Sequence, residues 1–498
     1  MGEWIRAAPE MFLVCAISVI LVVDVFLPPA QRRATFYLTM LALLGTALCS
    51  VYFGAGERTT LLFEGFVADP AGNALKLFAY AIVAIVFLYS RDYLEREGLL
   101  KGEYFILGLF ALLGIMVMIS ANSLLILYLG LELLSLALYA LVAFDRESSV
   151  AAESAMKYFV LGAIASGTLL YGISVLYGVT GTVDIGELGA YFSSGEGAQV
   201  AGQALGQAGP QAAALLGLAF VIVGVAFKFG AVPFHMWLPD VYQGARTPVT
   251  LFISTAPKLA SFALAWRVMV EGLGGLHGSW QDMVIVLSVL SLAVGNVAAI
   301  AQTNLKRMLA YSTISHVGFI LMGFIAGTPQ GLSAAMFYTI AYAFMAAAAF
   351  GMIILLSREG FEAENIADFK GLNAREPWFA FMMLMIMFSM AGIPLFVGFY
   401  AKLVVLESVL DAGLVWLAVL GVFFAVVGAF YYIRLIWFMY FAEAEGEVAR
   451  DASGGVGPSD VLEASTSLRI VVSANALVLL GLGLFPGVLL DLCASVLG

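Results

Sequence analysis

Charged residues are scarce in this chain. Asp, Glu, Lys and Arg make up 11% of its 498 residues, whereas 62% are hydrophobic. A soluble domain keeps about a quarter of its residues charged, so this composition excludes an ordinary soluble protein and is typical of a protein embedded in a lipid bilayer. The mean hydropathy of +1.00 agrees. The net charge of −11 offers no basic surface, and nucleic acid is therefore not expected as a partner.

Cysteines and nucleotide-binding motifs are also lacking. The three cysteines, Cys15, Cys49 and Cys493, lie far apart, and no C-x-x-C spacing occurs. An iron–sulfur cluster or a zinc ion held by this chain is therefore not expected. No G-x-x-x-x-G-K motif is present, nor a G-x-G-x-x-G motif placed after a strand, so no nucleotide site is expected either. We predict that the chain holds no cofactor of its own.

Long apolar runs are what the sequence has instead. A helix that spans a bilayer needs about 20 mainly apolar residues. Apolar runs bounded by charged residues, glycine and proline predict an all-α integral membrane protein with about fourteen transmembrane helices. The predicted spans are 9–27, 34–53, 70–90, 104–120, 122–144, 155–178, 211–243, 247–270, 281–301, 304–326, 330–357, 377–410, 414–440 and 467–492.

Positive charge falls in every second loop between these spans. By contrast, the loop at 181–210 has three acidic residues and no Lys or Arg. Because basic loops face the cytoplasm, the pattern predicts that both termini lie on the opposite side. The loop residues that set this orientation are Arg32, Arg33, Arg91, Arg96, Lys101, Arg146, Arg246, Arg358, Lys370, Arg375 and Arg450.

Two spans are too long to be single straight helices. Residues 211–243 and 377–410 would each extend about 50 Å, against a hydrocarbon core of about 30 Å. Gly230 and Pro233 interrupt the first, and Gly392 and Pro394 interrupt the second. An ordinary proline kink would explain one such site. Two breaks at matching places favour a transport function, because paired interrupted helices mark transport sites.

The two broken helices belong to segments that match weakly. Ala-Met-Lys-Tyr at 155–158 recurs as Ala-Met-Phe-Tyr at 335–338, and five predicted helices separate the two sites. An odd number of helices inverts the topology, so we predict two inverted five-helix repeats. The predicted segments are 1–103 (three helices), 104–270 (first repeat, broken near 230–233), 281–440 (second repeat, broken near 392–394) and 441–498 (a cytoplasmic loop and a final helix).

Four ionisable residues lie deep inside predicted spans: Glu132, Lys228, Lys258 and Lys402. Each charged residue at the centre of a membrane helix raises the free energy of insertion by roughly 2.5–3.5 kcal/mol, so a helix with apolar residues at these positions would be more stable in the membrane. A static buried ion pair would account for the presence of one lysine and one glutamate in the membrane interior. Because lysines outnumber the one glutamate, we favour a relay in which changing partners let the lysines gain and lose protons.

Other ionisable residues allow two interpretations. Lys157, at the start of its span, would either join the relay or extend its ammonium to the membrane surface. His316 would either shuttle protons or serve as a hydrogen-bonded core residue. Lys306 and Arg307 are expected to be basic anchors at the cytoplasmic surface.

Three stretches resemble the antiporter-like subunits of complex I and of Mrp-type cation/proton antiporters. They are FKFGAVPFHMWLPDVYQGARTPV at 227–249, NLKRMLAYSTISHVG at 304–318 and AGIPLFVGFYAK at 391–402. The chain length and the lysine at position 402 resemble the N-type branch. The resemblance implies that Glu132 modulates Lys228, that Lys258 is a connecting lysine and that Lys402 ends the path. Lys228 precedes its proline whereas Lys402 follows its own, so the two are not strictly equivalent.

The resemblance also implies a function and a setting. The chain would be a proton-translocating subunit of a redox-driven NADH:quinone oxidoreductase in a bacterial inner membrane, with periplasmic termini. NADH, FMN, iron–sulfur clusters and quinone would be bound by partner subunits. The implied neighbours are an M-type antiporter-like subunit, small K-type and J-type subunits, and the lateral helix of an L-type subunit. The alternatives are an Mrp-type sodium/proton antiporter subunit and a non-pumping scaffold.

Overall fold

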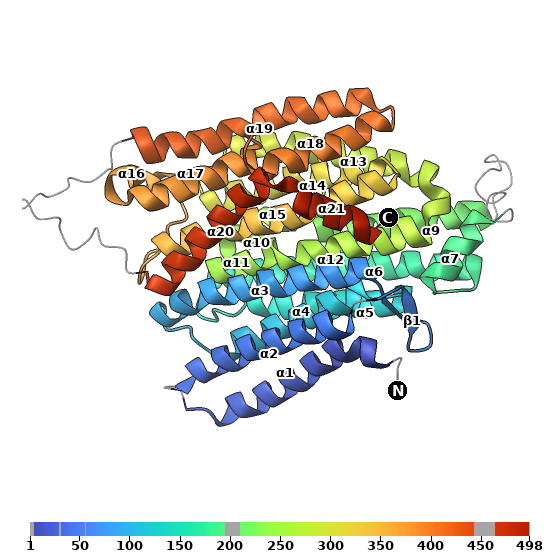
Figure 1. Cartoon of the computed structure of the whole chain (residues 1–498), viewed down its shortest axis with the longest axis horizontal. Coiled ribbons are helices and arrows are strands. Elements are labelled where there is room, and N and C mark those ends of the chain that lie inside the picture. Colours follow the sequence, from blue (N-terminus) through green and yellow to red (C-terminus); the bar gives the residue numbers. More distant parts are fainter. Residues whose placement is uncertain (1–3, 29–30, 55, 195–209, 443–463, 498) are drawn as a thin grey trace, which may run out of the picture.

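Long apolar helices run side by side along one axis of the molecule (Figure 1). The computed structural model describes residues 4–28, 31–54, 56–194, 210–442 and 464–497. Within these ranges, 13 helices are long and apolar enough to cross a membrane. Two shorter helices, α17 (Pro377–Ala391) and α18 (Val397–Asp411), together fill the place of the predicted span 377–410. The predicted all-α membrane fold is confirmed.

The first part of the chain forms three long helices, followed by the helices of the predicted segment 104–270. A 3₁₀ helix (Trp4–Ala7) opens the described chain, and a small antiparallel hairpin, β1 (Thr59–Leu61) and β2 (Phe66–Ala68), follows α2. The helices are α1 (Ala8–Phe26), α2 (Arg33–Phe53), α3 (Pro70–Arg96), α4 (Gly102–Ile119), α5 (Leu124–Val142), α6 (Ser149–Thr180), α7 (Ile185–Ser193), α9 (Pro210–Phe229), α10 (Trp237–Gly244), α11 (Thr247–Ser254), α12 (Ala256–Ala265) and a π-helix (Trp266–Gly272).

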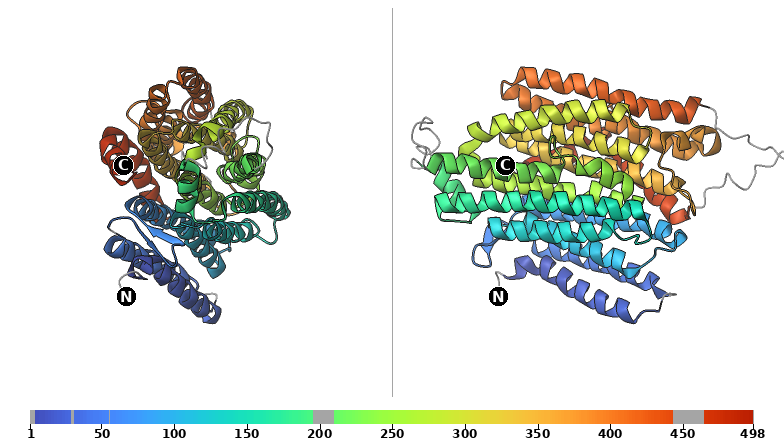
Figure 2. Two further views of the ribbon diagram at one scale, coloured as in Figure 1. Left: turned by 90° about the vertical axis from the view of Figure 1, so that its right-hand side faces the viewer. Right: turned by 180° about the vertical axis from the view of Figure 1, so that it is seen from behind.

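The second part continues the bundle on its other side. In the end-on view of Figure 2, α1–α3 and α17–α19 lie at opposite sides, while α20 and α21 cover one flank. The elements are 3₁₀ helices at Gly274–Leu276 and Ile366–Phe369, α13 (His277–Ile300), α14 (Leu305–Ile325), α15 (Pro329–Leu356), α16 (Leu372–Arg375), α17, α18, α19 (Val415–Phe441), α20 (Thr466–Leu484) and α21 (Pro486–Leu497).

Local capping sets many of the helix starts. The first N–H groups of a helix have no partner within it, and a short polar side chain before the helix satisfies one of them. Among the described helices, seven begin with such a residue, whose side chain accepts a hydrogen bond from the second or third backbone N–H of the helix: Asp69 (α3), Ser123 (α5), Ser148 (α6), Asp184 (α7), Asn304 (α14), Thr328 (α15) and Ser465 (α20).

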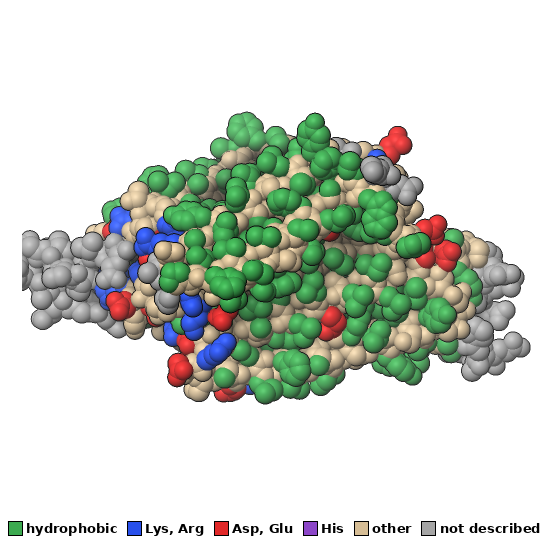
Figure 3. Space-filling model, turned by 90° about the horizontal axis from the view of Figure 1, so that it is seen from below, with side chains coloured by type: hydrophobic (Ala, Val, Ile, Leu, Met, Phe, Trp, Pro, Cys, Tyr) green, Lys and Arg blue, Asp and Glu red, His purple; other side chains and the backbone are tan. Residues whose placement is uncertain are grey.

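One end of the bundle is basic. Lys and Arg side chains gather there, and apolar side chains cover the middle of the molecule (Figure 3). We call this end, where Arg96 and Arg246 lie, the basic end. Arg246 pairs with Asp145, just before α6, and Arg96 donates to Ser357 O, just after α15. The helix α6 thus starts where α15 finishes, so the two run in opposite directions. Their first residues, 149 and 329, are 180 residues apart, as are the matching motifs at 155–158 and 335–338.

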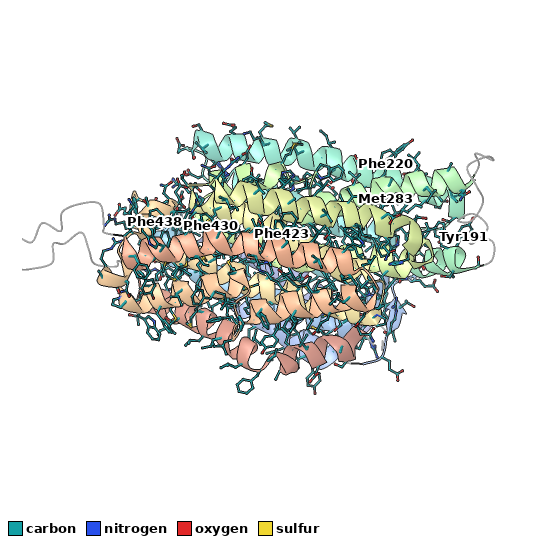
Figure 4. All side chains as sticks on the ribbon, turned by 90° about the horizontal axis from the view of Figure 1, so that it is seen from above. Tyr191, Phe220, Met283, Phe423, Phe430 and Phe438 are labelled. Atoms are coloured by element: carbon teal, nitrogen blue, oxygen red, sulfur yellow. The ribbon has the colours of Figure 1, made fainter. Side chains whose placement is uncertain are left out.

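The outer surface of the bundle is apolar along its length. Phe423, Phe430 and Phe438 lie in a row along α19 (Figure 4), and the first two are exposed. Exposed aromatic side chains along a whole helix fit contact with lipid or with a neighbouring membrane subunit. The helices α1 and α2 are similarly exposed. Polar groups such as Lys258, His316 and Lys402 are instead buried inside the bundle.

Both predicted breaks are confirmed. The helix α9 ends at Phe229, and Gly230 has a φ of +79° before the non-helical segment that leads to α10. The helix α17 ends at Ala391, and Gly392 has a φ of +85° before α18 begins at Val397. Both glycines adopt the left-handed conformation that residues with a Cβ disfavour, and each ends its helix.

Two further predicted spans contain breaks that were not predicted from the sequence. The run 247–270 is interrupted at Thr255 (φ −114°, ψ −92°), two residues before Pro257, and the run 467–492 is interrupted at Phe485, just before Pro486. Proline supplies no N–H, so Pro257 leaves the carbonyl four residues before it without the usual helical bond. Pro486 also disfavours the helical conformation of Phe485, the residue before it. The first interruption places Lys258 in the opening turn of α12. The predicted loop at 443–458 lies outside the described residues, and the loop at 181–210 contains α7.

Candidate functional site

The first buried charges lie where α5 faces the end of α9. Glu132 and Ser135 are three residues apart and share one face of α5. The Lys228 ammonium donates a hydrogen bond of 2.7 Å to Ser135 Oγ. Glu132 is close enough to act on Lys228 electrostatically, but no ion pair joins them in the described chain, and Glu132 Oε1 is buried without a hydrogen-bond partner. The structure thus brings these two residues together without binding them to each other.

Lys258 and Lys402 each bind the carbonyl end of a broken helix. Lys258 Nζ donates to Phe229 O at 2.8 Å, and Phe229 is the last residue of α9. Lys402 Nζ donates to Met390 O at 3.2 Å and to Ala391 O at 2.7 Å, at the end of α17. The last carbonyls of a helix lack partners within it and carry its partial negative charge, so a broken helix offers a cation site in mid-bundle.

This shared geometry shows which lysines correspond. The sequence indicated that Lys228 and Lys402 are not strictly equivalent, because Lys228 precedes the proline that breaks its helix and Lys402 follows its own. In the structure, Lys258 and Lys402 make the equivalent contact, and both are buried, with 1% and 9% of their surface exposed. Lys228 instead bonds a serine hydroxyl on a neighbouring helix.

A small cavity connects Lys228 with Lys258. It has a volume of about 20 Å³, and its lining includes both lysines, Ser135 and Ser261. Ser261 Oγ also donates to the backbone oxygen of Lys228 at 3.3 Å. A space of this size with several polar partners accommodates one water molecule. The geometry therefore allows a proton to pass between the two lysines through a single water.

His316 lies in a buried network of hydroxyl groups in the second half. Its Nδ1 is 2.7 Å from Tyr338 Oη, and its Nε2 is 3.1 Å from Tyr432 Oη. Lys402 Nζ lies 5.4 Å from the centre of the Phe319 ring, one turn along α14 from His316. His316 is therefore a core histidine with both ring nitrogens hydrogen-bonded. Its position beside Lys402 is also compatible with the proton-shuttle interpretation.

Lys157 lies apart from this interior. Its side chain is 44% exposed, and its ammonium binds Glu153 and Asp240 at 2.9 Å each. Asp240 also binds Arg307 at 2.8 Å, so it links α6, α10 and α14 near the basic end. This placement fits the surface interpretation of Lys157 better than the relay interpretation.

Lys306 was wrongly expected to be a surface anchor. Its side chain is 1% exposed, and Nζ donates to Ala245 O at 2.8 Å and to Glu362 Oε2 at 3.4 Å. Glu362 Oε1 accepts hydrogen bonds from Tyr93 Oη and from the N–H and hydroxyl of Thr247. Nothing local in the sequence marks Glu362, because its partners come from α3, α11 and α14.

These partners fix the charge of Glu362, which lies in the loop after α15. Burial acts to raise the pKa of this carboxyl group, but the nearby Lys306 ammonium and the hydrogen bonds from Thr247 and Tyr93 outweigh burial and lower the pKa to about 2. Glu362 is therefore an anion at any physiological pH. A group that stays charged cannot carry protons, so we assign it a structural role.

A second buried ion cluster was also missed. Arg267, which is fully buried, binds Asp69 at 2.6 Å and Glu271 at 2.9 Å, and Glu271 also binds Arg58. The position of Arg267 inside the apolar run 247–270 was the available signal. No group of three His, Cys, Asp or Glu side chains able to hold a metal ion is found in the described ranges.

The chain resembles known proteins along its whole length. A family model described as "NADH:quinone oxidoreductase/Mrp antiporter, TM" matches residues 121–428, which include Glu132, Lys228, Lys258, His316 and Lys402. The curated NADH-quinone oxidoreductase subunit N of Thioalkalivibrio sulfidiphilus is 54% identical to the chain over 494 residues, which cover 99% of this chain and 98% of that protein.

Solved structures share the fold. A chain of respiratory complex I from Thermus thermophilus matches with a TM-score of 0.78 at 28% identity, and the match covers 98% of this chain and 99% of that one. A chain of an Mrp complex from Dietzia sp. DQ12-45-1b matches with a TM-score of 0.83 at 22% identity, covering 99% and 97%. The second likeness, at such low identity, shows the fold alone.

Proposed function

Because the chain belongs to the NADH:quinone oxidoreductase/Mrp antiporter family of membrane proteins, we propose that it is the N-type subunit of an NADH–quinone oxidoreductase and that it translocates protons. The identity of 54% over nearly the whole chain supports the oxidoreductase. An Mrp-type antiporter has less support, because the Mrp likeness is one of fold.

The contact of Lys258 and Lys402 with helix-end carbonyls carries the proposal. Neither ammonium has a carboxylate partner within the described residues; each is held by the neutral oxygens of a broken helix. Breaking a buried ion pair leaves an uncompensated charge and costs several kcal/mol, so a lysine held by a carboxylate keeps its proton. A buried lysine held by dipoles can lose its proton without leaving such a charge behind.

The path that follows from the geometry runs through both halves of the chain. A change in the spacing of Glu132 and Lys228 would move a proton from Lys228 through the water-sized cavity to Lys258. From there the proton would reach His316 and Lys402 in the second half. The predicted segments 104–270 and 281–440 would each contribute one lysine at a broken helix.

Electron transfer elsewhere must drive this movement. Moving one charge against 100 mV costs about 2.3 kcal/mol. NADH, FMN, iron–sulfur clusters and quinone would be bound in partner subunits, and their redox reaction would alter the charge near Glu132. The enzyme would lie in a bacterial inner membrane with the termini of this chain on the periplasmic side. Its neighbours would be the M-type subunit, the small K-type and J-type subunits and the lateral helix of the L-type subunit.

The test uses inverted membrane vesicles that contain the whole enzyme. In Lys258→Ala, Lys402→Ala and Glu132→Gln, we expect normal amounts of assembled complex but a clear loss of NADH-driven proton uptake, measured by quenching of an acridine dye. Lys101→Ala, which removes a lysine in the loop before α4, serves as the control and should pump normally. Normal uptake in all three relay variants would reject the proposal. Proton uptake driven by a sodium gradient without NADH would favour the antiporter.

A further inference from the structure

Both ring nitrogens of His316 face a tyrosine hydroxyl. Tyr338, on α15, lies 2.7 Å from Nδ1, and Tyr432, on α19, lies 3.1 Å from Nε2. All three side chains are buried, with 3%, 0% and 2% of their surface exposed. Tyr432 Oη also bonds Ser312 Oγ, on α14. The four groups form one hydrogen-bonded chain, Ser312–Tyr432–His316–Tyr338, which we call the hydroxyl–imidazole chain.

The hydrogen bonds of the hydroxyl–imidazole chain can be oriented in either of two directions, because of the chemistry of imidazole. A neutral imidazole has one N–H donor and one acceptor nitrogen, so one tyrosine must accept a hydrogen bond from the ring and the other must donate one to it. A hydroxyl group both donates and accepts, and it rotates to suit its partners. The whole chain can therefore point either way, and the passage of one proton along it converts one direction into the other.

One end of the hydroxyl–imidazole chain lies near Lys402. Ser312, His316 and Phe319 lie at i, i+4 and i+7 on one face of α14, and each step advances about 5 Å from the start of that helix near the basic end. The Phe319 ring stacks on Tyr338, with 6.0 Å between ring centres and 12° between planes, and Lys402 Nζ lies 5.4 Å from the same Phe319 ring. Tyr338 is thus at the Lys402 end of the chain, and Ser312 is at the other end.

We propose that the hydroxyls of Tyr432 and Tyr338 carry the proton into and out of His316 on its way to Lys402. This inference rests on the proposed function, because it requires that protons reach Lys402. A proton arriving from the side of Ser312 binds Tyr432 Oη while the original Tyr432 proton moves to Nε2. The Nδ1 proton then passes to Tyr338 Oη, whose own proton passes on toward the Lys402 amine.

The step is balanced and leaves a defined state. Each tyrosine oxygen gains one proton and loses one, Nε2 gains one and Nδ1 loses one, no electrons move, and one neutral amine becomes an ammonium. Afterwards the hydroxyl–imidazole chain points in the opposite direction. The hydroxyl groups and the imidazole tautomer must return to their first orientation before the next proton passes, so the chain transmits one proton in each cycle.

The test removes one hydroxyl group at a time from the assembled enzyme. Tyr432→Phe and Tyr338→Phe each break the chain and keep the ring. The protein offers matched controls: Tyr104, on α4, bonds Ser90 Oγ, and Tyr342, one turn from Tyr338 on α15, bonds Thr313. Both control residues are at most 1% exposed. Tyr104→Phe and Tyr342→Phe therefore each lose an equally buried hydroxyl group that bonds no member of the hydroxyl–imidazole chain.

Lys402→Ala is the reference variant, because its decrease in NADH-driven proton uptake measures the share of uptake that depends on this subunit. We expect Tyr432→Phe and Tyr338→Phe to lose as much uptake as Lys402→Ala at normal assembly, and both controls to pump like the unmodified enzyme. Equal effects in all four tyrosine variants would show a structural role and overturn the inference. Normal uptake in Tyr432→Phe and Tyr338→Phe beside a deficient Lys402→Ala would overturn it and leave the proposed function standing. Normal uptake in Lys402→Ala would remove the proposed function first.

Discussion

Glu362→Gln tests how the two halves are joined at the basic end. The Glu362 carboxylate connects α3, α11 and α14 through Tyr93, Thr247 and Lys306. Glutamine keeps the size of the side chain and an oxygen that accepts hydrogen bonds, but it removes the charge. Lys306, which is almost fully buried, would then retain only Ala245 O and the more distant Glu364, at 3.6 Å, as partners.

The structure sets the size of the effect. A carboxyl group held at a pKa of about 2, against an ordinary 4.5, stabilises the folded chain by about 3 kcal/mol at neutral pH. Breaking a buried ion pair by removing one partner costs about 3–5 kcal/mol, which agrees. For a chain of this length, about 3 kcal/mol corresponds to a fall of about 3 °C in the midpoint of thermal unfolding.

The assay heats the purified complex in detergent and records the temperature at which half of this subunit has been lost from it. Glu364→Gln is the matched control, because Glu364 faces the same lysine but its side chain is 33% exposed. An exposed partner contributes about 0–1 kcal/mol, so its midpoint should fall by about 1 °C or less. Equal midpoints for the two variants would refute the assignment of Glu362 as the carboxylate that holds Lys306.

The pH dependence supplies a second check. Because the folded pKa of Glu362 is depressed, its stabilisation is present above the unfolded value of about 4.5 and disappears as the pH falls through about 2. The difference between the unmodified enzyme and Glu362→Gln should therefore be constant from pH 8 to pH 5.5 and should shrink below pH 4.5. A difference that vanished between pH 8 and 6 would contradict the assigned cause.

Three further variants test other parts of the structure. In Gly392→Ala, the new Cβ would lie 2.9 Å from Lys402 Cδ and the residue would keep a φ of +85°, at a cost of about 1–2 kcal/mol; we expect reduced proton uptake by vesicles at normal assembly. Asp69→Asn leaves Arg267 without its nearest counter-charge, which costs about 3–5 kcal/mol, so native gels should show little assembled complex. Lys157→Ala removes only solvent-exposed ion pairs, which contribute little, and proton uptake should change less than about twofold; a tenfold loss would place Lys157 in the relay.

The sequence alone determined the membrane character, the two breaks and the positions of charged residues inside apolar spans. These features are local: apolar runs of fixed length, Gly–Pro interruptions at 230–233 and 392–394, and charges such as Glu132 inside apolar runs need no knowledge of neighbours. The further breaks before Pro257 and Pro486 were missed because both prolines lie inside otherwise apolar runs of ordinary length.

Only the tertiary structure decided what each charge contacts. It showed that Lys258 and Lys402 bind helix-end carbonyls, that Tyr338 and Tyr432 flank His316, and that Lys306 is buried against Glu362. These partners are 11 to 116 residues apart in the chain and meet through the packing of helices from different segments. Burial and the choice of partner fix whether a charged side chain stays charged, and both are properties of that packing, so no local pattern of residues encodes them.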